Sequence, residues 1–232
     1  MIIQILSNLF EEGYLSRSKY TALSPFFAGA NVAFRREALI QTGDYDINCL
    51  SGEDQDMCLR IARAGWELYF EPKAIIRHKN QMTLRAFVRK WFDYGFHHPY
   101  IFQKHGSKGL KIYGTKRARN NGESIYNTLI KMRFPFNIYL FLTPFLIMHI
   151  LIFLAILIAV LGYFIPAVIA AVLALVTAIA YFRSDLATKN PIQSIHFIFF
   201  RYAANIALIL GGFFGGLKYR MLYISATFDY TA

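Results

Sequence analysis

The feature that most constrains this chain is a long apolar run: residues 134–182 contain no Asp, Glu, Lys or Arg. As one α-helix, this run would be roughly 74 Å long at about 1.5 Å per residue, against a bilayer hydrocarbon core of about 30 Å. One crossing cannot use that length, but two can, and residues 162–166 provide the glycine and proline of a turn between them. The sequence therefore predicts two membrane helices, over residues 139–162 and 164–182.

A third apolar stretch, residues 194–217, is interrupted by Arg201 and contains four glycines near its end. A charge at the centre of a bilayer costs at least about 2.5 kcal/mol. Either Arg201 packs against protein or the segment lies partly in the membrane interface. We expect a full crossing, which gives a membrane region of two to three helices over residues 134–232.

The formal net charge of +11 is concentrated just before the apolar run. The cationic residues there are Lys104, Lys108, Lys111, Lys116, Arg117, Arg119, Lys131 and Arg133. Beside membrane helices, such a cluster indicates cytosolic placement and attraction to anionic lipid. We prefer this interpretation to a nucleic-acid-binding patch and predict a basic juxtamembrane linker over residues 101–133.

Two features indicate the compartment. Cys49 and Cys58 lack the spacing of metal ligands and do not suggest a disulfide framework, so we expect a reducing environment. The N-terminus has no positive region and meets acidic residues early, so it is not a secretory signal peptide. The expected location is an integral protein of the plasma or inner membrane, with residues 1–100 in the cytoplasm.

The acidic residues are densest at S-G-E-D-Q-D-M-C-L-R, where Glu53, Asp54 and Asp56 lie within four positions. Apolar residues then recur at helical spacing, which predicts a helix over residues 53–64 ended by Gly65. Ser51 and Asp54 fit a capping box, and acids in a first turn also suit the helix dipole. This pattern alone therefore does not require a catalytic role.

Other short elements surround this helix. Residues 35–42 read as a helix closed by Gly43, and residues 32–34, 66–70 and 74–77 read as strands. Residues 83–95 form an amphipathic pattern, which suits either a helix at the membrane interface or one packed on a protein core. The adjacent His97 and His98, just before Pro99, are predicted to lie in a loop.

Three segments in order carry a resemblance: F-F-A-G-A-N-V-A-F-R-R-E-A-L, then T-G-D-Y-D, then G-E-D-Q-D-M-C-L-R-I-A-R-A-G-W-E-L-Y-F-E-P-K-A-I-I-R-H. Together they resemble the acceptor-side half of family-2 inverting glycosyltransferases of the GT-A fold. The likeness covers residues 24–78 and continues more weakly to residue 95. The membrane helices that follow resemble those of polysaccharide synthases in the same family.

The resemblance implies catalytic roles for two of the acids. Asp54 would be the general base that takes the proton from an acceptor hydroxyl as it attacks the anomeric carbon of a nucleotide sugar. A positioned carboxylate suits this task because a hydroxyl is a poor nucleophile until its proton leaves. Glu53 would orient the acceptor or its loop.

The resemblance also implies binding residues. Gly29 and Asn31 match the loop beside the donor sugar, and His78 matches a position that completes a site for Mn²⁺ or Mg²⁺ in some relatives. A surface histidine at the end of a strand explains His78 equally well. Asp56 and Arg60 are further candidate substrate-binding residues, although their i,i+4 spacing also suits an ordinary helix ion pair.

The chain departs from the family in one respect: no D-x-D with the expected context precedes Gly29. Asp44 and Asp46 have the spacing but follow the G-x-N segment, so we assign neither to metal. The expected fold class is α/β, a partial GT-A-like domain with an incomplete nucleotide-binding half, followed by an α-helical transmembrane region. The chain is thus expected to be a piece of a longer enzyme, a truncated product or one part of a split enzyme.

Two functions compete at this stage. One is the C-terminal portion of a membrane glycosyltransferase in cell-surface polysaccharide synthesis. Its expected partners are a nucleotide sugar, a glycan or lipid-linked acceptor, membrane lipid and a chain that supplies the nucleotide-binding half. The other is a non-catalytic membrane module of a polysaccharide synthase. No nucleic-acid partner is expected.

Overall fold

The computed structural model describes residues 19–20, 25–26, 29–68, 83–115, 126–186 and 191–225. The predicted metal residue His78 and the predicted strand at residues 74–77 lie outside these ranges, as does the end of the strand predicted at residues 66–70. Within them the chain is mixed α/β, with a four-stranded sheet, a small helical region before it and long apolar helices after it.

The N-terminal region contains two short helices. An antiparallel pair, β1 (Lys19–Tyr20) and β2 (Pro25–Phe26), precedes the 3-10 turn η1 (Gly29–Asn31). The helices α2 (Arg36–Thr42) and α3 (Glu53–Arg63) follow. Both helices confirm the sequence predictions, but residues 32–34, predicted as a strand, belong to no strand.

Glycines set the ends of these helices. Gly43 follows α2 with φ 81°, and Gly65 lies just beyond α3 with φ 91°, as their positions predicted. The predicted capping box is wrong, because the residue that caps α3 is Gly52, with φ 85° and no side-chain hydrogen bond to the helix. A left-handed backbone favours glycine, so the chain enters α3 through a sharp turn and not through a Ser51 cap.

The next helix, α4 (Leu84–His105), is longer than its predicted span. Thr83 caps it by accepting a hydrogen bond from the Ala86 N–H at 3.2 Å. The prediction that His97 and His98 lie in a loop is wrong, since both are helical and Pro99 lies inside the helix. A proline costs about 3 kcal/mol in a helix interior, and the burial of one side of α4 outweighs that cost.

Four strands form the sheet in the order β4-β3-β5-β6. They are β3 (Leu110–Thr115), β4 (Tyr126–Met132), β5 (Asn137–Leu142) and β6 (Met221–Ile224). The hairpin partners β3 and β4 are antiparallel, and the other two pairings are parallel. Aromatic side chains pack the C-terminal end of α4 against this sheet: Phe102, Tyr113, Tyr139, Phe141 and Tyr223.

This sheet revises several sequence boundaries. Residues 101–133, predicted as a linker, contain the end of α4 and the strands β3 and β4, so the division after residue 100 falls inside a helix. Residues 139–142 are strand and not the start of a membrane helix. Residues 221–224, predicted as a tail, pair with β5. Strands that pair in parallel over such a long separation in sequence leave no pattern in the local sequence that would predict the pairing.

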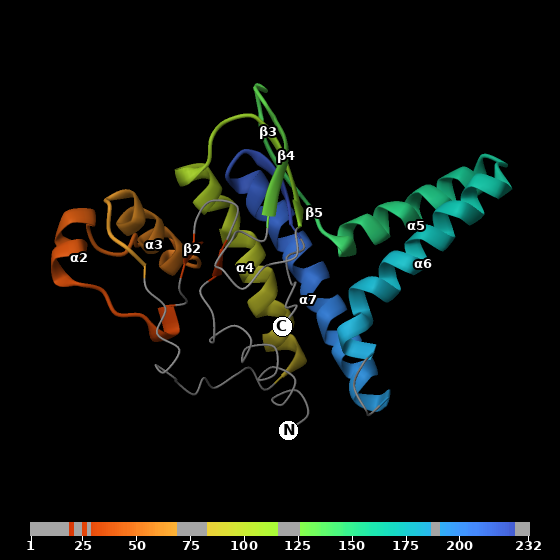
Figure 1. Ribbon diagram of the computed structural model, residues 1–232, viewed down its shortest axis with the longest axis horizontal. Coiled ribbons are helices and arrows are strands. Elements are labelled where there is room, and N and C mark those ends of the chain that lie inside the picture. The colour runs from red at the N-terminus through yellow and green to blue at the C-terminus, as the bar shows by residue number, and fades with distance from the viewer. Residues whose placement is uncertain are drawn as a thin grey trace.

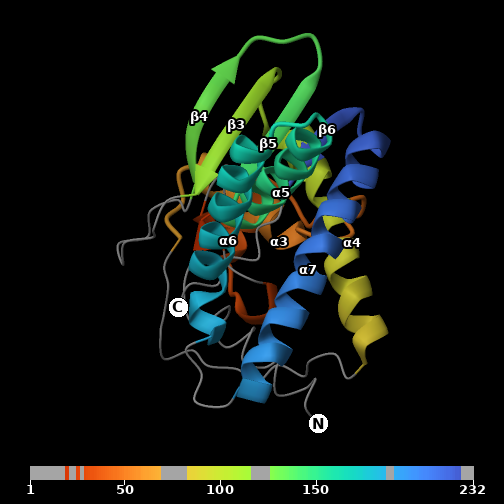
Figure 2. The ribbon, with the colours of Figure 1, turned by 90° about the vertical axis from the view of Figure 1, so that its right-hand side faces the viewer.

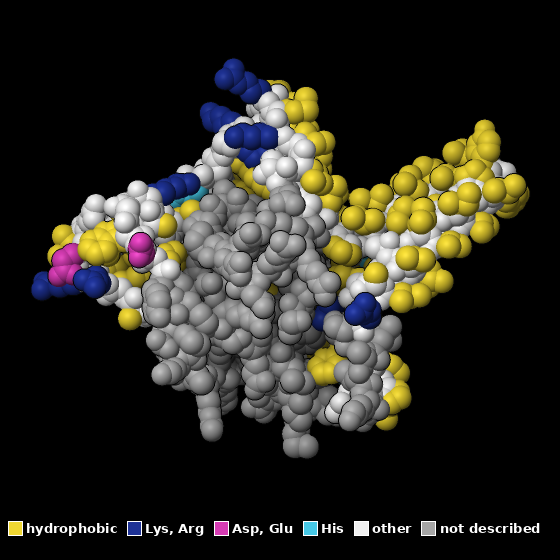
Figure 3. Space-filling model, in the orientation of Figure 1, with side chains coloured by type: hydrophobic (Ala, Val, Ile, Leu, Met, Phe, Trp, Pro, Cys, Tyr) yellow, Lys and Arg dark blue, Asp and Glu magenta, His cyan; other side chains and the backbone are white. Residues whose placement is uncertain are grey.

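The apolar run folds into a two-helix arm of α5 (Pro144–Val160) and α6 (Phe164–Leu186). Figure 1 shows this arm projecting away from the sheet and from α4. The turn between its helices contains Gly162 with φ 85°, as predicted. Hydrophobic side chains cover its surface (Figure 3), and most of those on α6 are exposed.

The last helix, α7 (Pro191–Lys218), lies alongside α4 (Figure 2). Among the described residues, Phe164–Arg183 and Pro191–Lys218 are long and apolar enough to cross a membrane, while α5 is shorter at 17 residues. Arg201 is buried, with its guanidinium 5.5 Å from the Tyr181 ring centroid of α6. Of the two alternatives for Arg201, the structure confirms packing against protein.

Candidate functional site

The first acid of interest, Asp54, is held by two backbone N–H groups at the start of α3. The N–H of Gly29 donates to Asp54 Oδ2 at 3.0 Å, and the N–H of Gln55 donates to Oδ1 at 2.7 Å. The G-x-N and E-D segments, 25 residues apart in sequence, are therefore in contact. A Cβ on Gly29 would lie 3.4 Å from the Asp54 Cβ, so a side chain there would crowd the carboxylate.

Glu53 and Tyr45 lie beside this carboxylate. Burial raises the pKa of Glu53, and the negative charge of Asp54 raises it further. Burial, followed by the charge of Asp54, also raises the pKa of Tyr45. No role for Tyr45 is predicted from the sequence, although its place in the T-G-D-Y-D segment is the available signal.

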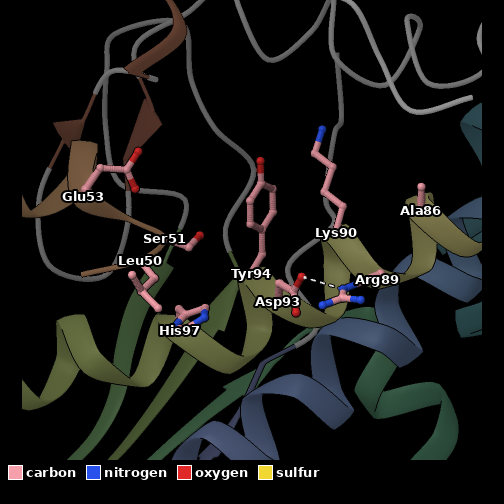
Figure 4. A pocket seen from close by; sticks show the side chains of 9 residues that line it. All are labelled: Leu50, Ser51, Glu53, Ala86, Arg89, Lys90, Asp93, Tyr94 and His97. Atoms are coloured by element: carbon pink, nitrogen blue, oxygen red, sulfur yellow. Dashed lines mark ion pairs between the residues drawn. The ribbon is translucent and has the colours of Figure 1, made fainter. Parts of the chain in front are cut away.

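An open groove of about 630 Å³ runs between the start of α3 and one face of α4 (Figure 4). Its lining residues are Leu50, Ser51, Glu53, Ala86, Arg89, Lys90, Asp93, Tyr94 and His97. Figure 4 shows Lys90 and Tyr94 rising from α4 on the same side, with Glu53 facing them from α3. The groove thus combines carboxylates, cations and an aromatic ring, which together suit a polar, hydroxyl-rich ligand.

Asp56, the last of the acids, does not line the groove, and its buried carboxylate is surrounded by basic side chains. Its carboxylate lies 2.9 Å from Arg60 Nε, 2.9 Å from Lys104 Nζ and 2.6 Å from His105 Nε2. Burial raises the pKa of Asp56, but the hydrogen bonds from His105 and Lys104 outweigh burial and lower it below its usual value. In this position Asp56 joins α3 to the end of α4.

Arg60 makes the i,i+4 ion pair with Asp56 that its spacing suggested. Its guanidinium also donates to the backbone carbonyls of Thr42 at 2.6 Å, Gly43 at 3.0 Å and Asp44 at 2.8 Å. These bonds hold the end of α2 and the following loop against α3. Asp56 and Arg60, both candidate substrate-binding residues, are thus engaged with protein groups in this structure.

Asp46, in the same loop, is tied to α4. Its carboxylate accepts hydrogen bonds from Lys104 Nζ at 2.7 Å and from the Tyr100 hydroxyl at 2.8 Å. The Lys104 ammonium holds the pKa of Asp46 well below its usual range. Lys104 therefore bridges Asp46 and Asp56, whereas the sequence predicts it only as one member of a basic cluster.

A second connection runs from α3 through α4 to the sheet. His98 Nε2 lies 3.2 Å from Gln55 Oε1, and its Nδ1 lies 2.9 Å from the Tyr223 hydroxyl of β6. Because an amide oxygen only accepts, Nε2 carries the proton and Tyr223 donates to Nδ1. Burial lowers the pKa of His98 to about 4, which keeps the ring neutral. Gln55 thereby anchors the turn that carries Glu53 and Asp54.

The structure gives less information on the remaining predicted site residues, Asn31 and His78. Asn31 lies in the same 3-10 turn as Gly29, at an exposed position. Among the residues that the structure describes, no group of three or more His, Cys, Asp or Glu side chains could hold a metal ion. The described acids thus do not fit the expected divalent-metal site, and His78 lies outside this part of the chain.

Comparison with known proteins gives partial matches. Over 70 residues the chain is 33% identical to a pre-mycofactocin glycosyltransferase of Mycobacterium tuberculosis. This aligned stretch covers 30% of this chain and 15% of that protein. Over 87 residues it is 28% identical to the O-antigen chain rhamnosyltransferase WbaN of Salmonella anatum. This second stretch covers 36% of this chain and 28% of that protein. No solved structure matches.

The match to a family profile is broader. The profile described as glycosyl transferase family group 2 matches residues 7–183, which include α2, α3, α4, the strands β3 to β5 and most of the α5–α6 arm. The matched region thus joins the carboxylates of α3 to the apolar helices. This chain belongs to glycosyl transferase family group 2.

Proposed function

We propose that this chain forms the acceptor side of a membrane-bound glycosyltransferase that moves a sugar from a nucleotide-sugar donor to a glycan or lipid-linked acceptor, with inversion. The observation that carries the proposal is the placement of Asp54, whose two carboxylate oxygens accept backbone N–H groups of Gly29 and Gln55 and which follows directly on the groove residue Glu53. The named activities of the two relatives, both sugar transferases, support it.

In the proposed reaction, Asp54 removes the proton of an acceptor hydroxyl. The hydroxyl oxygen forms a bond to the anomeric carbon, while the bond from that carbon to the nucleoside diphosphate breaks and the diphosphate leaves with the electron pair. The Gly29 and Gln55 N–H groups fix the direction of the carboxylate. A base positioned in this way typically contributes about 10²- to 10⁴-fold to rate.

Glu53 has a different part in this proposal. Its raised pKa and its place in the groove suit a carboxyl group that hydrogen-bonds acceptor hydroxyls, while Asp54 takes the proton. Tyr45 would border the same site. Two adjacent acids in unlike environments are a usual way to divide such roles.

The donor side of the reaction needs more than the described residues provide. Gly29 and Asn31 would border the donor sugar, and a partner segment or chain would supply the nucleotide-binding half. The matched regions span only 15% and 28% of the two relatives' lengths. A Mn²⁺ or Mg²⁺ ion on the diphosphate, with His78 as one ligand, stays a prediction, and no step above depends on it.

The apolar arm supports the membrane part of the proposal. In the apolar span Phe164–Arg183 of α6, only 17% of the most apolar 18-residue window is buried, so its apolar surface needs another covering. A bilayer provides one, since about 20 apolar residues cross its hydrocarbon core. We infer an integral membrane protein whose α2–α4 region faces the cytoplasm and acts in cell-surface polysaccharide synthesis.

The test is a transfer assay in membranes that contain the native protein, supplied with a panel of radiolabelled nucleotide sugars. The Asp54→Asn variant keeps the size of the side chain but removes the base, so incorporation should fall about 100-fold or more. Asp44→Asn is the matched control, because the exposed Asp44 contributes its backbone carbonyl and not its carboxylate to the Arg60 contact. Normal transfer by Asp54→Asn would refute the assignment.

A further inference from the structure

We propose that the outer face of the four-stranded sheet, the face turned away from α4, lies against a bilayer that contains anionic lipid. The proposed function assigns the α5–α6 arm to the membrane, and this inference rests on that assignment and adds a second contact surface to it. It follows from the strand register, from the exposure of the side chains, and from the position of the sheet between the arm and a group of cations.

The strand register divides the sheet into two unlike faces. The inner face carries aromatic rings, with Tyr113, Tyr139 and Tyr223 packed against Phe102 of α4. The outer face carries two rows of aliphatic side chains, each with one residue from every strand: Met132–Leu110–Ile138–Leu222 and Ile130–Ile112–Leu140–Ile224. Because side chains alternate across a strand, these eight share one side of the sheet.

This outer face is open to the surroundings. None of the eight side chains is buried, and Met132 is 57% exposed, Ile130 41% and Leu222 37%. The helix α7 packs on the inner face, as α4 does, since a Cβ on Gly212 would lie 3.0 Å from the Tyr223 ring. A contiguous apolar surface of this kind marks a site of contact with a protein or a membrane.

The outer face continues into the α5–α6 arm. Only Thr143 separates the end of β5 from the start of α5, and Figure 1 shows the arm leaving the sheet on the side opposite α4. Hydrophobic side chains line the flank of the sheet that faces the arm, as well as the arm itself (Figure 3). A bilayer around the arm is therefore the first surface that the outer face meets.

Cations gather at the end of the sheet away from the arm. Lys108 precedes β3, while Lys131 and Arg133 lie at the end of β4, and all three are exposed. Because β5 begins beside this end and continues into the arm, the cations lie about 17 Å along the strands from the arm, at about 3.3 Å per residue. Residues 106–143 contain seven Lys or Arg and one acid, Glu123. This excess suits the phosphates of anionic lipids.

Two aromatic residues extend the apolar surface at the same end. Phe134 and Phe136, in the connection between β4 and β5, are both exposed, and their ring centroids lie 6.2 Å apart. Phenylalanine beside lysine and arginine is typical of segments at the boundary between lipid headgroups and acyl chains. The sheet would thus lie on the leaflet, with its aliphatic rows toward the acyl chains and its cations among the headgroups.

The test measures the depth of single spin labels by electron paramagnetic resonance, with the full chain in nanodiscs of phosphatidylcholine and phosphatidylglycerol. Labels on Met132→Cys and Leu222→Cys sample the two edges of the sheet, in one row of the outer face. Cys49 and Cys58 are buried, and the unmodified chain gives the labelling background. At both labels, accessibility to oxygen should exceed accessibility to a water-soluble nickel chelate by about threefold or more, since a face buried about 5–10 Å into the boundary excludes water.

Lys131→Cys is the matched control. Lys131 directly precedes Met132, is exposed, and pairs with Lys111 of the inner face, so its label should favour the nickel chelate. A label on Ile156→Cys, at an exposed position of the arm, marks the hydrocarbon core and should favour oxygen. In discs of phosphatidylcholine alone, the preference for oxygen at Met132 should fall toward that of Lys131.

Three outcomes would overturn the proposal. A Met132 label as accessible to nickel as the Lys131 label would place the outer face in water. Labels shielded from both reagents would mean that protein, such as a second copy of the chain, covers the face. An unchanged preference without phosphatidylglycerol would remove the role of anionic lipid. If the Ile156 label also lies in water, the membrane part of the proposed function fails as well, whereas the Asp54→Asn assay tests the chemistry separately.

Discussion

Helix α4 is held on its two sides by opposite kinds of contact. Toward α3, the contact is made of charges and hydrogen bonds, with Lys104 and His105 on Asp56 and with His98 on Gln55. Toward α7, it is made of backbone surfaces in close approach. A Cβ on Gly95 would lie 2.3 Å from the Leu208 carbonyl oxygen, a distance that real side chains do not reach.

The two contact surfaces of α4 therefore have different roles. The close-packed side depends on shape and apolar packing and fixes α4 against α7, one of the helices long and apolar enough to cross a membrane. The polar side positions the turn that carries Glu53 and Asp54, and its strength depends on protonation and on each partner being present. Steric changes should therefore break one side, and changes of charge or pH the other.

The largest effect is expected from Gly211→Leu. A Cβ at this position would lie 2.1 Å from the Phe92 carbonyl oxygen, and backbone cannot move aside as a side chain can. Overpacking of this kind costs about 3 kcal/mol or more, so the variant should fail to accumulate or should lose most of its thermal stability in detergent. The measurement is the melting temperature of the purified protein.

Ala171→Leu is the control for that variant. Ala171 lies at an exposed position on α6, so the added side chain meets no packed neighbour. Its melting temperature should match that of the unmodified protein. A Gly211→Leu variant as stable as this control would mean that α4 and α7 are not closely packed.

Next in size is Asp56→Asn on the polar side. The Asp56 side chain is fully buried, and its loss would leave Arg60, Lys104 and His105 without their shared carboxylate. Removing one partner from a buried charge cluster costs about 3 kcal/mol, which denaturant unfolding should detect. Asp93→Asn breaks the exposed Arg89 pair and should cost less than about 0.5 kcal/mol. Equal losses in the two variants would contradict a special role for Asp56.

A third prediction concerns pH. The pKa of buried His98 is about 4, against an ordinary 6.5, so between these values the unfolded state binds the proton and the folded state does not. Stability should therefore fall as pH drops, by about 2 kcal/mol between pH 6.5 and pH 4.5. The comparison of unfolding curves at these two values checks it.

His98→Gln should reduce that pH dependence, because it removes the titrating ring while keeping groups that hydrogen-bond. His196→Gln is the control, since the His196 ring bonds the carbonyl of Ile192 in its own helix and connects no other described element. Unchanged pH dependence in His98→Gln would show that another group is responsible for the loss.

The sequence was informative where local geometry decides structure. Gly43 and Gly65 marked the ends of α2 and α3 because a left-handed backbone favours glycine. It failed where distant packing decides. The continuation of α4 through Pro99 and the pairing of residues 221–224 with β5 depend on contacts with segments far away in the chain.

The contacts of the candidate site also fall into those that the sequence predicts and those that it does not. The contact of Gly29 with Asp54 agrees with the resemblance to glycosyltransferases, which had grouped these residues. The partners of His98 are 43 and 125 residues away, and its pattern in sequence is only that of a histidine before a proline. Periodicity and spacing carry no information on such contacts, so the sequence placed His98 in a loop.

The smallest effect is expected from Arg60→Lys, which tests whether the polar side depends on geometry as well as charge. Lysine keeps the positive charge near Asp56, but one ammonium cannot reproduce the planar fork that also bonds the carbonyls of Thr42 and Asp44. The loss should be about 1 kcal/mol in free energy of unfolding, against no measurable change for Arg36→Lys on the exposed side of α2. If Arg60→Lys has the same free energy of unfolding as the unmodified protein, the positive charge alone accounts for the contribution of Arg60 to stability. A loss as large as that of Asp56→Asn would instead make the carbonyl bonds, and not the ion pair, the main connection between α2 and α3.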